Sequence, residues 1–151
     1  MNAPVRKVLP PVWLALCVVT GYALHKLMPV TQLFVEPWKY GGAGLIILGV
    51  VVSATAANLF KRADTPVIPF RPSTALVTTG WYRFTRNPMY LGMVLVACGV
   101  AIVQGSLGAW IPVPLFVAIL QLRFIRGEEK FLEEIFGEDY LRFKSRVRRW
   151  I

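Results

Sequence analysis

The sequence predicts an all-α, polytopic membrane protein with four transmembrane helices and a cytosolic, amphipathic C-terminal helix. Hydrophobic residues make up 56% of the 151-residue chain, and its mean hydropathy is +0.55. Charged residues make up only 17% and are segregated from the apolar stretches rather than interspersed with them. Lysine and arginine flank those stretches, which is typical of membrane spans. A chain of this length favours one domain, residues 1–151.

Four apolar segments predict the spans, at about 9–27, 41–60, 89–103 and 107–125. The third is short, because fifteen helical residues cover about 22 Å of a hydrocarbon core about 30 Å thick. We therefore expect tilt or local thinning of the bilayer at this span. Residues 104–106 leave room only for a tight helical hairpin between the third and fourth spans.

Two residue types inside the spans predict details of their packing. Pro112 and Pro114 lie within the fourth span, so we expect a kink there. Glycine lets helices approach closely in a membrane. The second span therefore predicts close helix packing at four positions: Gly41, Gly42, Gly44 and Gly49.

The distribution of basic residues predicts the orientation. Fifteen of the 17 lysine and arginine residues lie in the N-terminal stretch, in the 61–88 connection or in residues 123–151, against Lys26 and Lys39 on the other side. The positive-inside rule then makes both termini cytoplasmic. We expect a multi-pass integral membrane protein, in the cell inner membrane if its source is bacterial. Most of its polar chemistry then lies in the two cytosolic segments, 61–88 and 123–151.

The net charge of +9 raises the alternative of nucleic-acid binding. Nucleic-acid modules gather their basic residues on one face of a soluble fold, whereas here they flank apolar spans. The expected partner is the lipid bilayer and not nucleic acid. Cys17 and Cys98 lie inside apolar runs and His25 is the single histidine, so we expect no metal site.

The tail combines an amphipathic pattern with a basic end. Leu132, Ile135 and Phe136 recur at helical spacing, and Gly137 predicts the end of that helix. For the last eight residues, 144–151, we expect an interfacial helix held by anionic lipid and an aromatic anchor.

Two polar clusters could carry chemistry. Pro88 predicts the first residue of a helix with Asn87 as its N-cap. That helix start either lies plainly at the interface, with Arg83 and Arg86 reaching lipid phosphates, or receives an anionic ligand group.

The second cluster is the Glu128–Glu129 pair, at the membrane end of a helix. One interpretation is a solvated amphipathic helix whose glutamates pair with Lys130 or with arginines. The other is a carboxylate that meets a cationic or hydroxyl-rich ligand, because a desolvated carboxylate without a partner is costly.

Four runs occur in an order known from one group of enzymes. They are Leu76 to Gly80, Arg86 to Gly92, Glu128–Glu129, and Phe136 to Tyr140 followed by Arg146-Val147. Together they resemble the isoprenylcysteine carboxyl methyltransferase family and the related phospholipid N-methyltransferases. The resemblance covers roughly residues 65–151, and the first two spans match only as hydrophobic helices.

The resemblance implies a cytosolic pocket for S-adenosyl-L-methionine, closed by the C-terminal helix, with a lipophilic or prenylated acceptor entering from the lipid. It implies cofactor contacts at Thr74, Ala75, Leu76, Val77, Tyr82, Asn87, Pro88, Met89, Tyr90 and Glu128. The family commonly has histidine where this chain has Asn87, which cannot act as a titrating base. The arginine that holds the acceptor carboxylate is Arg123 or Arg126, and the spacing leaves both open.

The chemistry that the resemblance implies needs few catalytic groups. A methyl group on a sulfonium is already activated, so the protein mainly aligns the reactants and excludes water. A carboxylate acceptor needs no general base, whereas an ammonium group must first lose a proton. This favours carboxyl methylation of an isoprenylcysteine-like acceptor. The alternatives are N-methylation of an aminolipid head group and a non-catalytic membrane scaffold.

Overall fold

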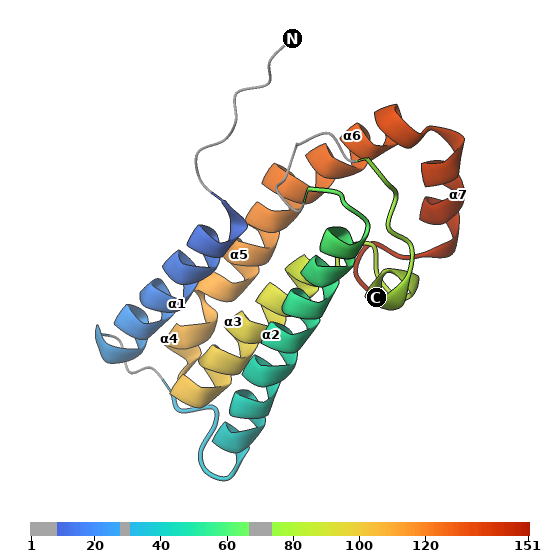
Figure 1. Ribbon diagram of the computed structural model, residues 1–151. Helices are drawn as coiled ribbons and strands as arrows, with labels where there is room; N and C mark the ends of the chain where they lie inside the picture. Colours follow the sequence, from blue (N-terminus) through green and yellow to red (C-terminus); the bar gives the residue numbers. More distant parts are fainter. Residues whose placement is uncertain (1–8, 28–30, 67–73) are drawn as a thin grey trace.

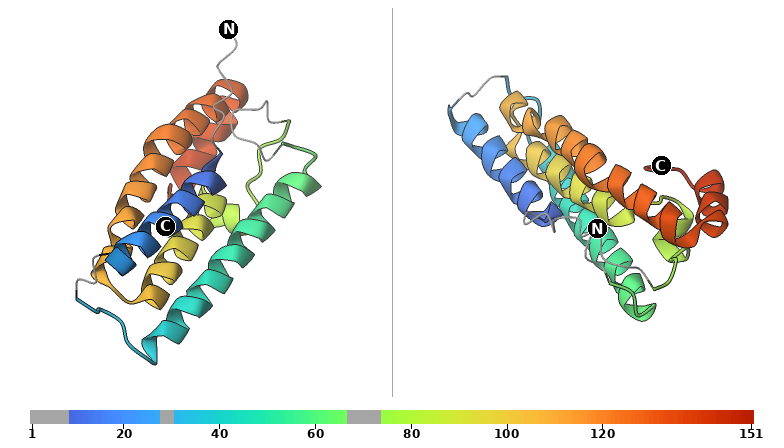
Figure 2. Two further views of the ribbon diagram at one scale, coloured as in Figure 1. Left: turned by 90° about the vertical axis from the view of Figure 1, so that its left-hand side faces the viewer. Right: turned by 90° about the horizontal axis from the view of Figure 1, so that it is seen from above.

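The computed structural model describes residues 9–27, 31–66 and 74–151, and in these ranges every regular element is a helix, as predicted. They are α1 (Pro10–Leu27), α2 (Trp38–Arg62), the 3-10 helix η1 (Gly80–Arg83), α3 (Pro88–Gln104), α4 (Leu107–Trp110), α5 (Pro112–Ile119), the π-helical η2 (Leu120–Ile125), α6 (Arg126–Phe136) and α7 (Glu138–Arg146). Helices α1, α2, α3 and the run from α4 to α6 lie side by side in one elongated bundle (Figures 1 and 2).

Each of the four apolar segments forms helix. Two helices are long and apolar enough to cross a membrane: α2, and the 30-residue helical stretch Leu107–Phe136 that contains α4 to α6. A helix of 30 residues is about 45 Å long and exceeds the hydrocarbon core of about 30 Å. Most of the charged residues of this stretch lie in its last part, α6. Helix α3 is apolar but shorter, as its segment predicted.

The turns between and within the helices follow local signals. Gly105 ends α3 with a φ of 83°, and the Ser106 side chain caps α4 by accepting a hydrogen bond from Ala109 N, so the tight hairpin is confirmed. At the proline pair the helix is interrupted by a turn at Ile111, directly before Pro112.

Helix α3 packs against α2 almost backbone to backbone. A Cβ atom built on Gly49 would lie 2.5 Å from the carbonyl oxygen of Gly92, and one on Gly42 would lie 2.7 Å from that of Gly99. Any larger residue at these positions would push the helices apart. Close packing is thus confirmed for two of the four glycines. The prediction was wrong for the two that face open space, Gly41 and Gly44.

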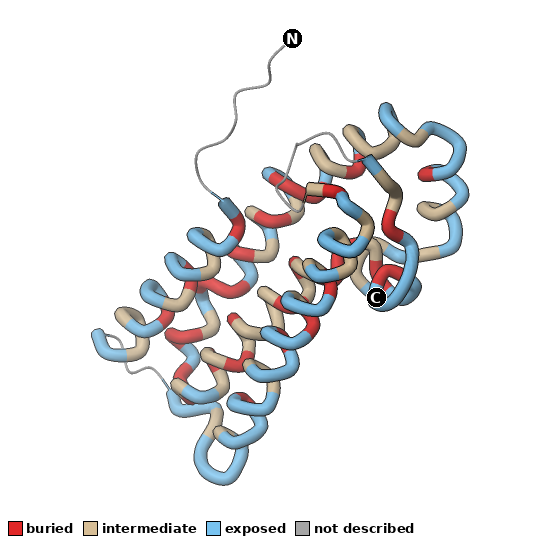
Figure 3. Tube along the Cα trace, viewed as in Figure 1, coloured by how far each residue is buried: buried red, intermediate tan, exposed pale blue. Residues whose placement is uncertain are grey.

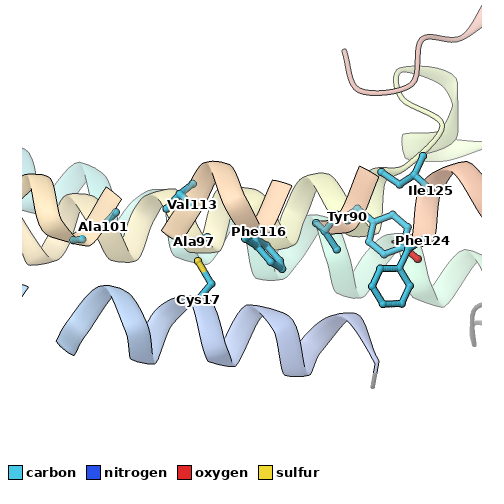
Figure 4. Packing of buried hydrophobic residues seen from close by; sticks show 10 residues of the cluster. Cys17, Tyr90, Ala97, Ala101, Val113, Phe116, Phe124 and Ile125 are labelled. Carbon is cyan, nitrogen blue, oxygen red and sulfur yellow. The ribbon is translucent and has the colours of Figure 1, made fainter. Parts of the chain in front are cut away.

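The main core lies between α1, α3, α5 and η2. Cys17 of α1 points into this core, while Tyr90, Phe124 and Ile125 continue the buried row toward the end of the bundle where α6 begins (Figure 4). The outer faces of α1 and α2 are exposed along their length (Figure 3), although they are apolar. Exposed apolar helix faces of this kind are typical of contact with lipid.

The end of the chain departs from its prediction. Gly137, with a φ of 50°, ends α6 as expected. Helix α7 then ends at Arg146, and the chain returns toward η1 (Figure 1) instead of continuing as an interfacial helix. The indole Nε1 of Trp150 donates to Oε1 of Gln121 at 3.1 Å, and its ring packs against the main core. The prediction for 144–151 was wrong, because these residues find partners within the protein.

Candidate active site

A pocket lies where the first turn of α3 meets α6, α7 and the chain before η1. Its cavity volume is about 60 Å³, and the wider free space around it, about 570 Å³, is partly open to solvent. Its lining is Phe60, Ala75, Leu76, Val77, Tyr82, Arg86, Asn87, Met89, Tyr90, Glu128, Glu129, Leu132, Tyr140 and Phe143. Segments far apart in the sequence therefore build one concave site.

Contacts with α2 hold the first half of the lining in place. The Ser53 hydroxyl donates to the carbonyl oxygen of Met89 at 3.0 Å, and Nε1 of Trp81 donates to the Thr55 hydroxyl at 2.8 Å. The ring of Tyr82 packs on Phe60, with centroids 5.5 Å apart. Together these contacts fix η1 and the start of α3 on the end of α2.

The structure brings most of the implied cofactor residues together. Eight of the ten line the pocket: Ala75, Leu76, Val77, Tyr82, Asn87, Met89, Tyr90 and Glu128. Thr74 and Pro88 do not line it. Thr74 is exposed, and its hydroxyl donates to the carbonyl oxygen of Asp64 at 2.9 Å. Pro88 is buried as the first residue of α3.

Asn87 occupies the N-cap position of α3, but its side chain makes no capping hydrogen bond. Its Nδ2 donates instead to the carbonyl oxygen of Arg149 at 3.0 Å, and the Thr85 hydroxyl donates to the same oxygen at 3.1 Å. Asn87 is thus the N-cap residue as predicted, but its side chain does not cap the helix, because the returning chain offers this amide a different partner.

Tyr90 and Glu128 meet across the pocket. The Tyr90 hydroxyl donates to Oε1 of Glu128 at 2.5 Å. Burial raises the pKa of Glu128 to about 7; the hydrogen bond from Tyr90 lowers it, and the nearby charge of Glu129 raises it further. This carboxyl group is thus poised to gain or lose a proton near neutral pH.

Glu129 forms the centre of a charged cluster at the pocket wall. Its side chain is 8% exposed and accepts from Arg149 twice, at 2.9 Å from Nε and 2.6 Å from Nη2. Nη2 of Arg86 lies 3.1 Å from its Oε1, and the Arg86 side chain is only 9% exposed. Arg86 therefore does not reach outward to lipid phosphates, so that interpretation was wrong for Arg86, whereas Arg83 is exposed. Lys130 pairs with Glu134 and not with either residue of the glutamate pair.

The two arginines implied for the acceptor lie outside the pocket lining. Both Arg123 and Arg126 are exposed. The guanidinium of Arg123 lies over the ring of Trp13, 5.5 Å from its centroid. The arginines that do reach the site, Arg86 and Arg149, were not among the residues implied for it. Arg86 begins the Arg86 to Gly92 run that predicted the site, whereas nothing in the sequence around Arg149 signals its role.

A family model described as phospholipid methyltransferase matches residues 38–139, about two thirds of the chain. The chain belongs to the phospholipid methyltransferase family. The matched range of this family member begins at the first residue of α2 and includes Tyr90, Glu128 and Glu129. It ends before Arg149.

Named relatives agree with this membership. The protein-S-isoprenylcysteine O-methyltransferase of Saccharomyces cerevisiae is 31% identical over 111 residues, which cover 70% of this chain and 45% of that enzyme. Protein-S-isoprenylcysteine O-methyltransferase B of Arabidopsis thaliana is 29% identical over 139 residues, covering 83% of this chain and 71% of the plant enzyme.

An uncharacterized protein of Haemophilus influenzae is 36% identical to this phospholipid methyltransferase family member over 63 residues, which cover 42% of this chain and all of that protein. The chain thus spans less than half the length of the yeast relative and a larger share of the plant one. No solved structure matches it.

Proposed function

We propose that this chain transfers a methyl group from S-adenosyl-L-methionine to a lipophilic acceptor at the cytoplasmic face of a membrane. The observation that carries the proposal is the shared pocket of Tyr90, Glu128 and the Ala75 to Val77 run. Membership in a methyltransferase family supports the reaction class. The exposed apolar faces of α1 and α2 support the membrane setting.

The pocket residues fit the proposed cofactor chemically. When bound, S-adenosyl-L-methionine supplies an activated methyl group on a positive sulfonium. The Glu128 carboxylate matches a ribose diol or a cationic group, because an ionised carboxylate accepts strong hydrogen bonds. Apolar walls from Phe60, Val77, Met89 and Leu132 suit the flat adenine ring. The chain's part in the reaction is to orient the two reactants and to exclude water.

The proposed topology has four spans with both termini in the cytoplasm. The pocket lies at the end of the bundle where α1 begins, α2 ends and α3 begins (Figure 1). That end also carries the two basic segments, so the positive-inside rule assigns it to the cytoplasm. Helices α1 and α3, with 18 and 17 residues, are about 26 Å long and imply tilt or a thinned bilayer.

The acceptor is proposed to be the carboxylate of an isoprenylcysteine-like group. The printed names of the yeast and Arabidopsis relatives support this acceptor class. The described pocket lining contains no histidine to deprotonate an ammonium group, and a carboxylate needs no base. The acceptor approaches from lipid, and Arg123 or Arg126 is proposed to hold its carboxylate, since both are exposed near the start of α6.

A second candidate is N-methylation of an aminolipid head group. The family description favours it, and so does Glu128, whose pKa of about 7 suits acceptance of a proton from an ammonium group. The two candidates differ in the bond formed, which is an ester in one case and a methylated amine in the other.

The stability of the product toward alkali distinguishes an ester from a methylated amine. Membranes that contain the chain are incubated with methyl-labelled S-adenosyl-L-methionine and either a farnesylcysteine analogue or an aminolipid. Label that enters the lipid fraction and is released by mild alkali supports carboxyl methylation, whereas alkali-stable label supports the amine. The matched control is Glu128→Ala, which should reduce transfer strongly. Absence of transfer, together with absence of S-adenosylhomocysteine binding in detergent, would overturn both candidate functions.

A further inference from the structure

Arg86 lines the pocket and carries hydrogen-bond donors that have no partner in the described part of the chain. Its side chain is 9% exposed and makes one ion pair, through Nη2, with Glu129. Its Nε and Nη1 atoms are buried and have no hydrogen-bond partner among the described residues. Buried charged donors without acceptors are costly, so an acceptor from a ligand would stabilise this arrangement.

The charge around Arg86 favours an anionic ligand group. Arg86 and Arg149 contribute two positive charges, and the Glu129 carboxylate between them contributes one negative charge. The cluster therefore has a net charge of about +1, in a place with little solvent to screen it. One carboxylate would bring it to neutrality. Glu129 would oppose this only weakly, because both of its oxygens are already engaged by arginine.

The start of α3 supplies a second, independent attraction for an anion. The first N–H groups of an α-helix have no acceptor within the helix, and the positive end of the helix dipole lies there. Asn87 does not cap them with its side chain. Met89 and Tyr90, in that first turn, line the same pocket as Arg86. A helix start and a buried guanidinium thus converge on one space, an arrangement suited to binding a carboxylate.

We propose that Arg86 and the first turn of α3 bind the α-carboxylate of the methionine part of S-adenosyl-L-methionine. This inference rests on the proposed function and specifies how the cofactor is oriented. The cofactor has one carboxylate, which Arg86 would receive, and its cationic groups and ribose hydroxyls remain for Glu128. The acceptor carboxylate is left to Arg123 or Arg126, which are exposed outside the pocket lining.

A two-ligand comparison tests the proposal without relying on activity. Calorimetry in detergent measures binding of S-adenosylhomocysteine and of its decarboxylated analogue, which lacks only the carboxylate. Wild type should bind the complete ligand at least tenfold more tightly. Arg86→Gln should lose that preference while it binds the analogue about as well as wild type does. Binding of the analogue then also serves as the control for correct folding of the variant.

The remaining outcomes are also decisive. If wild type shows no preference between the two ligands, or if Arg86→Gln keeps the preference, the proposal is overturned. If Arg86→Gln instead binds both ligands normally but needs far more acceptor for turnover, Arg86 contacts the acceptor and the proposal also fails. Should Arg86→Gln bind neither ligand, Arg86→Lys decides, since it keeps the cation beside Glu129; a retained preference supports the proposal and equal binding overturns it. A wild-type protein that binds neither ligand refutes the proposed function itself.

Discussion

The hydroxyl of Tyr90 and the Oε1 atom of Glu128 lie 2.5 Å apart, and their hydrogen bond joins the first turn of α3 to the first turn of α6. One residue belongs to a helix that packs on α2, and the other to the helical stretch that begins at Leu107. Together with the Arg86–Glu129 ion pair, this contact joins the two sides of the pocket.

Tyr90→Phe should lower the free energy of unfolding by about 1–3 kcal/mol, because the buried Glu128 carboxyl group loses its donor. Tyr82→Phe is the matched control for stability. Tyr82 is also a buried tyrosine of the pocket, but its hydroxyl has no hydrogen-bond partner in the described part of the chain. Thermal unfolding in detergent measures both variants. Equal losses would mean that the Tyr90–Glu128 contact contributes nothing specific.

Glu128 should make stability depend on pH. Burial raises its pKa from 4.5 to about 7, so the folded protein holds this proton more tightly than the unfolded chain does. The stabilisation is complete below about pH 4.5 and is lost as pH rises through about 7. At pH 8, Glu128→Gln should exceed wild type in unfolding free energy by about 1–3 kcal/mol, and the gap should close near pH 4.5. A gap that widens on acidification would contradict the assigned burial.

Cofactor binding should have the opposite pH dependence. A cationic or hydroxyl-rich ligand prefers the ionised carboxylate, which is a minor form at pH 6 and the major form at pH 8. S-adenosylhomocysteine affinity should therefore increase about tenfold from pH 6 to pH 8 in wild type. Glu128→Gln should bind more weakly and with little dependence on pH. Calorimetry at both pH values tests this, and a flat wild-type profile would exclude a direct role for Glu128.

Arg149 and Arg148 are neighbours with different roles. The guanidinium of Arg149 makes two hydrogen bonds to buried Glu129. The Arg148 side chain is exposed, and its backbone carbonyl oxygen accepts a hydrogen bond from Arg86 N at 2.9 Å. Arg149→Ala should cost about 1–3 kcal/mol of unfolding free energy, toward the lower end because Arg149 is 35% exposed. Arg148→Ala should stay within about 0.5 kcal/mol of wild type. Denaturant unfolding compares them, and a similar loss in both would show that charge alone matters.

The glycines of α2 offer an equally direct comparison. Gly49→Ala would place a methyl group 2.5 Å from the backbone oxygen of Gly92, so α2 and α3 must separate, at a cost of about 1–3 kcal/mol. Gly44→Ala meets nothing within 4 Å and should be neutral or stabilising, since alanine favours helix by about 1 kcal/mol. Thermal unfolding of both variants measures the difference. Equal stability would mean that the helices can shift at little cost.

The helices could be predicted because their signals are local. The apolar runs determine α1 to α3 and the stretch from Leu107, while Gly105 and Gly137 end helices where a residue with positive φ is needed. The run from Arg86 to Gly92 and the Glu128–Glu129 pair marked segments that do meet in one pocket. Such motifs carry the information for a site within a few residues.

What could not be predicted depends on contacts between distant residues. The tail from 144 to 151 is basic and ends in an aromatic residue, a composition that fits a lipid interface and a buried carboxylate equally well. Only the position of Glu129 decides that Arg149 turns inward. The same return of the chain takes the Asn87 amide away from the helix start. Local sequence preferences predict neither the contact of Arg149 with Glu129 nor the hydrogen bond of Asn87 to the Arg149 carbonyl oxygen.

Helix α1 packs on α3, α4 and α5 but adds no residue to the described pocket lining. Its outward side chains, among them Val12, Leu16 and Val19, are exposed. Changes on that face would alter how the molecule meets its neighbours in a bilayer while leaving its chemistry intact. The outer face of α1 is therefore where one apolar side chain can be exchanged for another with the least effect on the pocket.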